Sequence, residues 1–200
     1  MTEEQTRALM DYALACAADV SHGEGHIRRV LKNALALAEH YQQADRDVLC
    51  AAAILHDCAQ AEQLADASMH HAEEGAKKAR AFLLEQGADA AFAARVGEII
   101  GAHSSPVLAG EAGLEAMLLF DADKLEMCGA VGLSRALMYA LDNKEELYAP
   151  EGSESFYSVA RADAAFVREH LFTPEARALA GEKLKLSSAF LESLAQETKL

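Results

Sequence analysis

Apolar residues recur along this chain at the spacing of amphipathic helices, and segments that alternate apolar and polar residues are hard to find. Ala and Leu dominate the composition, Val and Ile are sparse, and Trp is absent. Between residues 26 and 41 the apolar side chains follow the i, i+3, i+4, i+7 spacing of one helix face, at Ile27, Val30, Leu31, Ala34, Leu35 and Ala38. The sequence therefore predicts an all-α protein.

The same periodicity and its breaks predict where the helices lie. We expect helices over residues 2–19, 26–41, 45–55, 70–86, 89–103 and 111–128, then one that reaches residue 143 after Gly129 and Gly132 loosen the chain, and finally 155–171 and 173–197. Residues 48–55 are apolar all round, which predicts a buried helix. The polar residues 60–68 are expected to form a loop, and residues 144–155 a mobile surface loop that could act as a lid.

Length and composition narrow the class of protein. A chain of 200 residues without internal repeats or linkers is expected to form one domain, residues 1–200, and 52% hydrophobic content excludes intrinsic disorder. A net charge of −14 argues against duplex nucleic acid as the main partner, since that binding depends on Lys and Arg. An acidic N-terminus and the lack of a long apolar run predict a cytoplasmic protein without a membrane span.

Two further features of composition bear on redox state and assembly. The four cysteines are scattered outside any metal-binding motif and are expected to be reduced thiols. The long amphipathic helix at the C-terminus is expected to close the core, or alternatively to form a dimer face, so the chain is predicted to be a monomer or a homodimer.

Histidines and aspartates stand at the ends or on the inner faces of several predicted helices, which favours a metal site. Imidazole and carboxylate groups are suitable ligands for Zn, Mn, Fe, Co or Ni. A coordination shell that mixes these nitrogen and oxygen ligands usually leaves coordination positions open for water. Asp121 and Asp123 lie inside an apolar run, where two carboxylates need compensation unless they are exposed on one helix face beside Lys124. The full set of candidates is His26, His56, Asp57, His71, His103, Asp121 and Asp123.

The adjacent pair His56 and Asp57 ends the helix predicted to be buried. Two polar side chains are costly to bury there without a partner, and a metal ion would be that partner. In the alternative interpretation the helix dipole favours His56 at this end and Asp57 opens the loop. His26 and Arg29 lie one helical turn apart, so a metal ligand and a phosphate-binding guanidinium would share a face, unless Arg29 is a solvated surface residue.

In their order these residues resemble the H…HD…D signature of the HD-domain superfamily of metal-dependent phosphohydrolases. The resemblance runs from about residue 19 to residue 197. Within the superfamily, the chain is similar to the small stand-alone bacterial branch of YpgQ/YedJ type. It implies an HD-type helical bundle with a signature core at about residues 19–143 and C-terminal helices over 155–197. It is carried by Ser21-His22-Gly23-x-x-His26-Ile27-x-Arg29-Val30, Ala53-Ile54-Leu55-His56-Asp57, Asp121-Ala122-Asp123-Lys124-Leu125, Gly129-Ala130-Val131-Gly132-Leu133-Ser134-Arg135 and Thr173-x-x-Ala176-Arg177.

The resemblance also implies a ligand set. A divalent ion, whether Mn, Mg, Co, Ni, Fe or Zn, would be held by His26, His56, Asp57 and Asp123. Asp123 matches the family's x-A-D-x-L pattern. Asp121 would instead contact the metal ligands without binding the ion itself. Two more histidines, His71 and His103, resemble positions with which some family members bind a second ion or the substrate phosphate. The acidic pair that follows the HD motif in some members is missing here, which leaves the general base open.

The activity implied is hydrolysis of a phosphoester or phosphoanhydride bond in a small phosphorylated substrate, expected to be a nucleotide. Either a nucleoside triphosphate pyrophosphohydrolase or a nucleotide phosphatase would fit, with metal-activated water as the nucleophile. Asp57 would accept a proton, and the added charge on the phosphate would be stabilised by Arg29, Lys124, His22 and His103. Two alternatives stay open: a phosphodiesterase on a cyclic or linear dinucleotide with a two-ion site, and a non-catalytic nucleotide-binding or signalling module.

Overall fold

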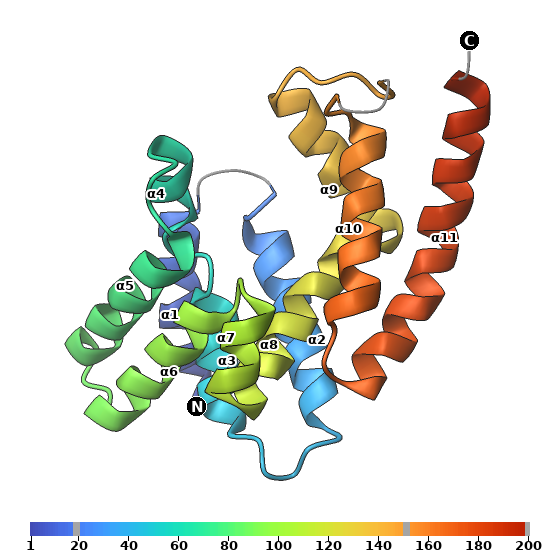
Figure 1. The fold of residues 1–200 in the computed structure, drawn as a ribbon. Coiled ribbons are helices and arrows are strands. Elements are labelled where there is room, and N and C mark those ends of the chain that lie inside the picture. The colour runs from blue at the N-terminus through green and yellow to red at the C-terminus, as the bar shows by residue number, and fades with distance from the viewer. Residues whose placement is uncertain (18–20, 150–152, 199–200) are drawn as a thin grey trace. The chain divides into compact units, whose positions relative to one another are not determined.

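The computed structural model describes residues 1–17, 21–149 and 153–198, and it confirms the all-α fold (Figure 1). Apart from one isolated bridge between Glu146 and Ser155, these residues contain no β structure. The chain divides into two compact units, Met1–Ala122 and Asp123–Leu200. That the two units act as one domain stays a prediction. Within the described part of the chain, no helix has both the length and the hydropathy that a membrane span requires.

The first unit is built from helices that follow one another with short connections. They are α1 (Glu3–Cys16), α2 (Glu24–Ala38), α3 (Arg46–Leu55), α4 (Gln60–Ala65), α5 (His71–Glu85), α6 (Ala90–Ala102), α7 (Pro106–Ala112) and α8 (Leu114–Lys124), whose last two residues belong to the second unit. The predicted helices over 26–41, 45–55, 70–86 and 89–103 are confirmed to within three residues at each end. The predicted end of the first helix, at residue 19, lies outside the described residues.

Helix α3 is the buried centre of the first unit, as its sequence predicts. Asp45 caps it by accepting hydrogen bonds from the backbone N–H groups of Asp47 and Val48. Every side chain from residue 51 to residue 55 is at most 1% exposed, and helices α1, α2 and α6 pack around them. Tight packing on several sides fixes the orientation of this helix and of the residues that end it.

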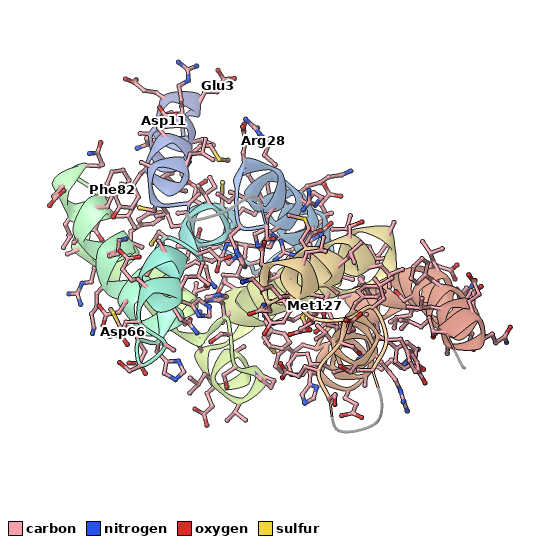
Figure 2. The ribbon with its side chains drawn as sticks, turned by 90° about the horizontal axis from the view of Figure 1, so that it is seen from above. Glu3, Asp11, Arg28, Asp66, Phe82 and Met127 are labelled. Carbon is pink, nitrogen blue, oxygen red and sulfur yellow. The ribbon has the colours of Figure 1, made fainter. Side chains whose placement is uncertain are left out.

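Helices α5 and α6 form a hairpin that packs beside this centre. The chain turns at Gly87, which follows the C-cap Gln86 and whose φ of +79° is the left-handed conformation that glycine adopts readily after a helix. On the other side of α5, Phe82 stacks on Tyr12 of α1 with ring centroids 3.9 Å apart. Phe82 is labelled in Figure 2, where Glu3, Asp11 and Arg28 mark the exposed faces of α1 and α2.

Two predictions for the middle of the chain were wrong. Residues 60–68 are not all loop, because α4 forms there without burying any side chain and is tied to α5 by the ion pair between Glu62 and Lys78. Residues 111–128 are not one helix. Pro106 begins α7 at a position where no N–H is needed, and Gly113, with φ of +96°, ends α7 before α8 starts.

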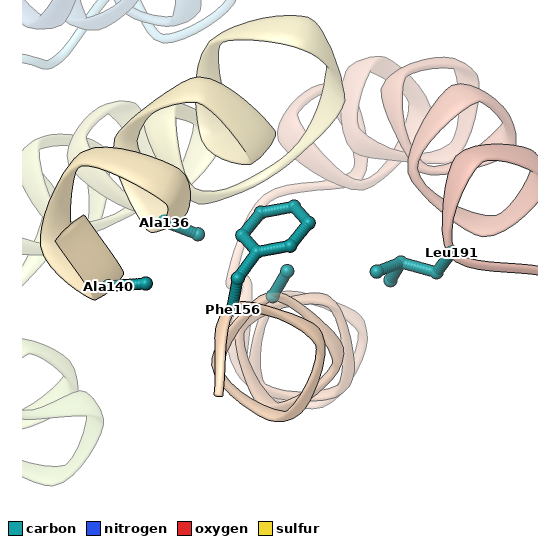
Figure 3. Close-up of a cluster of buried hydrophobic side chains, with 5 residues drawn as sticks. Ala136, Ala140, Phe156 and Leu191 are labelled. Carbon is teal, nitrogen blue, oxygen red and sulfur yellow. The ribbon is translucent and has the colours of Figure 1, made fainter. Parts of the chain in front are cut away.

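The second unit continues with η1 (Leu125–Met127), a 3-10 helix, followed by α9 (Gly129–Asp142), α10 (Phe156–His170) and α11 (Pro174–Thr198). Helix α9 starts at Gly129, so the glycines do not loosen the chain as predicted. The two C-terminal helices are confirmed and run antiparallel (Figure 1). The core joins α9, α10 and α11 and includes Ala160. Figure 3 shows Phe156 among Ala136, Ala140 and Leu191.

The described residues before α10, 144–149 and 153–155, are non-helical, as predicted. The two described ends of this segment are held together, since the backbone N–H groups of Phe156 and Tyr157 donate to the carbonyls of Glu146 and Leu147. Residues 150–152 of the predicted loop lie outside the described residues. A lid role for residues 144–155 stays a prediction.

Replacing Asp163 with asparagine should raise the free energy of unfolding near neutral pH. Asp163 is half-buried in α10, and burial raises its pKa to about 6 against the opposing charges of Lys124 and Arg135. Between its usual pKa of 3.8 and about 6, folded Asp163 keeps a proton that the unfolded chain has released, so its contribution to stability falls as pH rises through that window. Asparagine has no charge to desolvate, and we expect a gain of about 1–3 kcal/mol at pH 7.

Urea unfolding of both proteins at about pH 4 and pH 7 checks this prediction. The difference between the asparagine variant and the wild type should grow with pH. A difference that is equal at the two pH values, or a variant less stable than the wild type at pH 7, would show that the pairing of Asp163 with the two cations outweighs its burial.

Candidate metal centre

Four histidines from four parts of the first unit gather around one aspartate. His26 lies in the first turn of α2, His56 is the C-cap of α3, His71 opens α5 and His103 is the C-cap of α6. Asp57 follows His56 directly. Because α2 and α6 pack against α3, and α5 packs against α6, the helix ends bring residues 77 positions apart into one cluster, from 26 to 103.

The histidines divide between the two oxygens of Asp57. Its Oδ2 lies 3.2 Å from Nε2 of His56 and 3.4 Å from Nε2 of His26, and these two nitrogens are 3.2 Å apart. Its Oδ1 faces His103 at 3.6 Å and His71 at 4.0 Å, again through Nε2. His26, His56 and His103 are at most 1% exposed. The carboxylate therefore stands at the middle of the cluster, with one pair of imidazoles on each oxygen.

Backbone carbonyls set the orientation of two of these rings. Nδ1 of His56 is 3.0 Å from the carbonyl oxygen of Ala53, and Nδ1 of His103 is 2.6 Å from that of Ile100. A carbonyl only accepts, so each Nδ1 carries the proton and donates it. In the neutral ring, Nε2 then presents a lone pair toward the carboxylate of Asp57, and the same arrangement orients metal-bound histidines generally.

Lone pairs that face a carboxylate at 3.2 to 3.6 Å repel it unless a positive charge lies among them. A divalent cation would supply that charge, and one ligand atom each from His56, Asp57 and His103 lies within 4.8 Å of the others. When the rings are protonated instead, the His56 charge and hydrogen bonds from His103, His26 and His56 outweigh the burial that raises the pKa of Asp57, and they hold that pKa well below its usual range. Asp57 is thus ionised and fit to bind a cation.

Helix α4 was not predicted, and it contributes Gln63, a residue of the site that the sequence did not indicate. Gln63 Oε1 hydrogen bonds to Nδ1 of His71 and accepts the backbone N–H of His71 at 3.2 Å. His70, which precedes it in the chain, is exposed as the N-cap of α5. The neighbouring Glu62 pairs with Lys78. No sequence motif marks Gln63, because its role depends on where α4 packs.

The remaining predicted residues have different surroundings. The ring of His22, in the turn before α2, lies 6.0 Å from the ring of His26, and Arg29 is half-buried one turn further along α2. Asp121 is fully buried in α8. Asp123 and Lys124 end the same helix as the first residues of the second unit, and Nζ of Lys124 lies 2.6 Å from Oδ2 of Asp123. Their assigned roles stay predictions.

The histidine cluster lies within a segment that matches a known protein family. The HD domain family profile matches residues 23–128, which include all four histidines and Asp57. A protein from Lactobacillus plantarum is similar in structure, with a TM-score of 0.79 and 25% identity over 98% of both chains. YpgQ from Bacillus subtilis in complex with ADP has a TM-score of 0.76 and 24% identity, over 97% of this chain and 95% of that one.

A third structure, described as an HD-superfamily hydrolase from Bacillus thuringiensis, has a TM-score of 0.73 and 24% identity over 98% of this chain and 97% of that one. A search of the curated proteins found no match. The fold of the chain is therefore shared by several bacterial proteins along almost its full length.

Proposed function

Because this chain belongs to the HD domain family, we propose that it is a metal-dependent phosphohydrolase that cleaves a phosphoester or phosphoanhydride bond of a nucleotide. The observation that carries the proposal is the buried cluster in which Asp57 faces Nε2 of His26, His56, His71 and His103. Support for a nucleotide comes from ADP in the YpgQ structure, and support for hydrolysis from the description of the Bacillus thuringiensis protein. Nucleoside triphosphate pyrophosphohydrolase and nucleotide phosphatase activities both fit.

His26, His56 and Asp57 would hold the ion, with Asp123 as the fourth ligand that the family signature implies. When bound, the ion supplies an acidic water and a positive charge beside the phosphoryl oxygens. Asp57 accepts the proton of the attacking water at whichever of its oxygens is not engaged as a ligand. His56 and His103 stay oriented through the reaction, because their Nδ1 protons remain on the carbonyls of Ala53 and Ile100.

Cationic side chains would then stabilise the charge that develops on phosphate. Arg29 lies one turn beyond His26 on α2, and a guanidinium can bind two phosphate oxygens at once. Lys124, His22 and His103 are further candidates for this role. Because the whole chain carries a net charge of −14, binding of an anionic nucleotide depends on the ion and on these few local cations.

Release of phosphate and pyrophosphate from nucleoside mono-, di- and triphosphates and from dinucleotides tests the proposal. Each substrate is assayed with Mn, Mg, Co, Ni or no added metal. Metal-dependent turnover is expected, and the product identifies the bond. Stoichiometric metal binding without turnover on any substrate would instead favour the non-catalytic module, and a protein with neither metal nor turnover would contradict the proposal.

A second candidate function, a phosphodiesterase on a cyclic or linear dinucleotide with two ions, is favoured by one observation. Each oxygen of Asp57 has its own pair of histidines, His26 and His56 on Oδ2 and His71 and His103 on Oδ1. A carboxylate between two such pairs is suited to bridge two ions, as in two-metal hydrolases.

Replacing His103 with glutamine distinguishes the two candidates. If Asp57 bridges two ions, calorimetric titration with Mn should give two ions per wild-type chain and one per variant chain, with loss of dinucleotide cleavage. If one ion is bound by His26, His56 and Asp57, the wild type and the variant should each bind one. Replacement of the exposed His70 with glutamine is the matched control and should leave the stoichiometry unchanged.

A further inference from the structure

We propose that a groove between α10 and α11 binds a small phosphorylated molecule with an apolar body, of the size of a nucleoside monophosphate. The groove has a volume of about 470 Å³ and lies wholly within the second unit. None of its lining residues belongs to the candidate metal centre, so the site is independent of the proposed function.

The charge of the lining points to an anionic ligand. Arg168, Arg177 and Lys185 line the groove and no acidic side chain does, in a chain with 32 acidic and 18 basic side chains. Three cationic side chains around one groove attract an anion at a distance and hold it on contact.

Two of these cations are held in place by neighbouring groups. Nη2 of Arg168 donates to Oγ of Ser188 across the groove at 3.0 Å, so α10 and α11 both position this guanidinium. Arg177 donates through Nε to the carbonyl of Leu171 at 2.9 Å, a bond that does not use its terminal amino groups. Pre-positioned guanidinium groups suit phosphate, because they offer several donors in a fixed plane.

Lys185 adds a more mobile charge. Its Nζ lies 2.7 and 2.8 Å from the two carboxylate oxygens of Glu182, and both side chains are mostly exposed. An exposed pair of this kind is weak, so the ammonium group can exchange Glu182 for a phosphate oxygen at little cost.

The floor of the groove explains why the ligand is expected to carry an apolar body. Val167, Leu171 and Leu184 line it and are themselves at most 7% exposed. Arg168, Arg177 and Lys185 add the apolar stems of their side chains to the lining, so an apolar group resting in the groove would cover these stems and remove apolar surface from water. The volume lies within the range of about 300–1,000 Å³ that is usual for small-molecule sites.

Calorimetric titration of the full-length chain with AMP and, separately, with inorganic phosphate tests the proposal. The buffer contains low salt and EDTA, so that no divalent ion draws phosphate to the metal centre. We expect one saturable AMP site per chain, weaker binding of inorganic phosphate, and loss of affinity with added salt. Replacing Arg177 with glutamine should weaken AMP binding by roughly three- to tenfold, and Arg168→Gln should act in the same direction.

Arg161→Gln is the matched control, because Arg161 is an exposed arginine of α10 that does not line the groove. Thermal melting of each variant establishes that it is folded. The absence of saturable binding, or equal weakening by Arg161→Gln and Arg177→Gln, would overturn the proposal. Binding that survives both groove variants but is lost in Asp57→Ala would place the ligand at the metal centre, and AMP that binds no tighter than phosphate would overturn the role of the apolar floor.

Discussion

Replacing Asp57 with alanine should reduce metal-dependent release of phosphate or pyrophosphate by at least about a thousandfold. The substitution removes the carboxylate around which His26, His56, His71 and His103 gather. The remaining imidazoles are neutral ligands, so a divalent ion would lose a negative ligand and the attacking water its proton acceptor. We expect metal content, measured by mass spectrometry after dialysis, to fall together with the rate.

The structure supplies a matched control for this prediction. Asp66 is exposed and its carboxylate accepts hydrogen bonds from Ser68, outside the cluster. Asp66→Ala makes the same chemical change and should leave both rate and metal content within a factor of about two. An Asp57 variant that is folded by circular dichroism and retains a tenth of the activity would contradict the assignment of Asp57 to the reaction.

The sequence predicts part of the metal centre because the main signals come from residues that are neighbours in the chain. An unbroken apolar stretch predicts that α3 is buried, and a buried helix that ends in His56 and Asp57 predicts that these polar groups have partners. The partners are distant in the chain, and only the family signature joined them before the structure was known. The distances to Asp57 show that the histidines of the signature do meet it in the fold.

Features that depend on packing were not predicted. Helix α4 has no buried residue and therefore no amphipathic pattern, and Gln63 orients His71 only because this helix lies against α5. In the same way Asp163 looks in the sequence like one of many surface carboxylates. Its raised pKa arises from burial within the second unit, which periodicity alone does not show.

The structural roles of proline and glycine in the middle of the chain were likewise not predicted. No helix is predicted to start at Pro106, although a proline is suited to the first turn of a new helix, which is the role it has in α7. Gly129 and Gly132 are predicted to loosen the chain, but both lie within the first turn of α9. The missing side chain permits close contact of Gly129 with the side chain of Lys183 and of Gly132 with the backbone of Met127.

Gly132 is the position at which this close contact should matter most for stability. A Cβ atom added there would lie 2.3 Å from the carbonyl carbon of Met127 and 2.5 Å from its oxygen. Both atoms belong to the backbone of η1, which cannot move without displacing the start of α9. We expect Gly132→Ala to lower the free energy of unfolding by about 3 kcal/mol or more, measured by urea unfolding followed by circular dichroism.

Gly181→Ala gives the opposite expectation for the same substitution. Gly181 lies in the interior of α11, and nothing stands within 4 Å of an added Cβ. Alanine there should stabilise the chain by about 0.5–1 kcal/mol, since glycine loses more conformational freedom in a helix. If Gly132→Ala and Gly181→Ala changed stability equally, helix propensity alone would account for both. A loss confined to Gly132 would show that the approach of α9 to Met127 requires glycine.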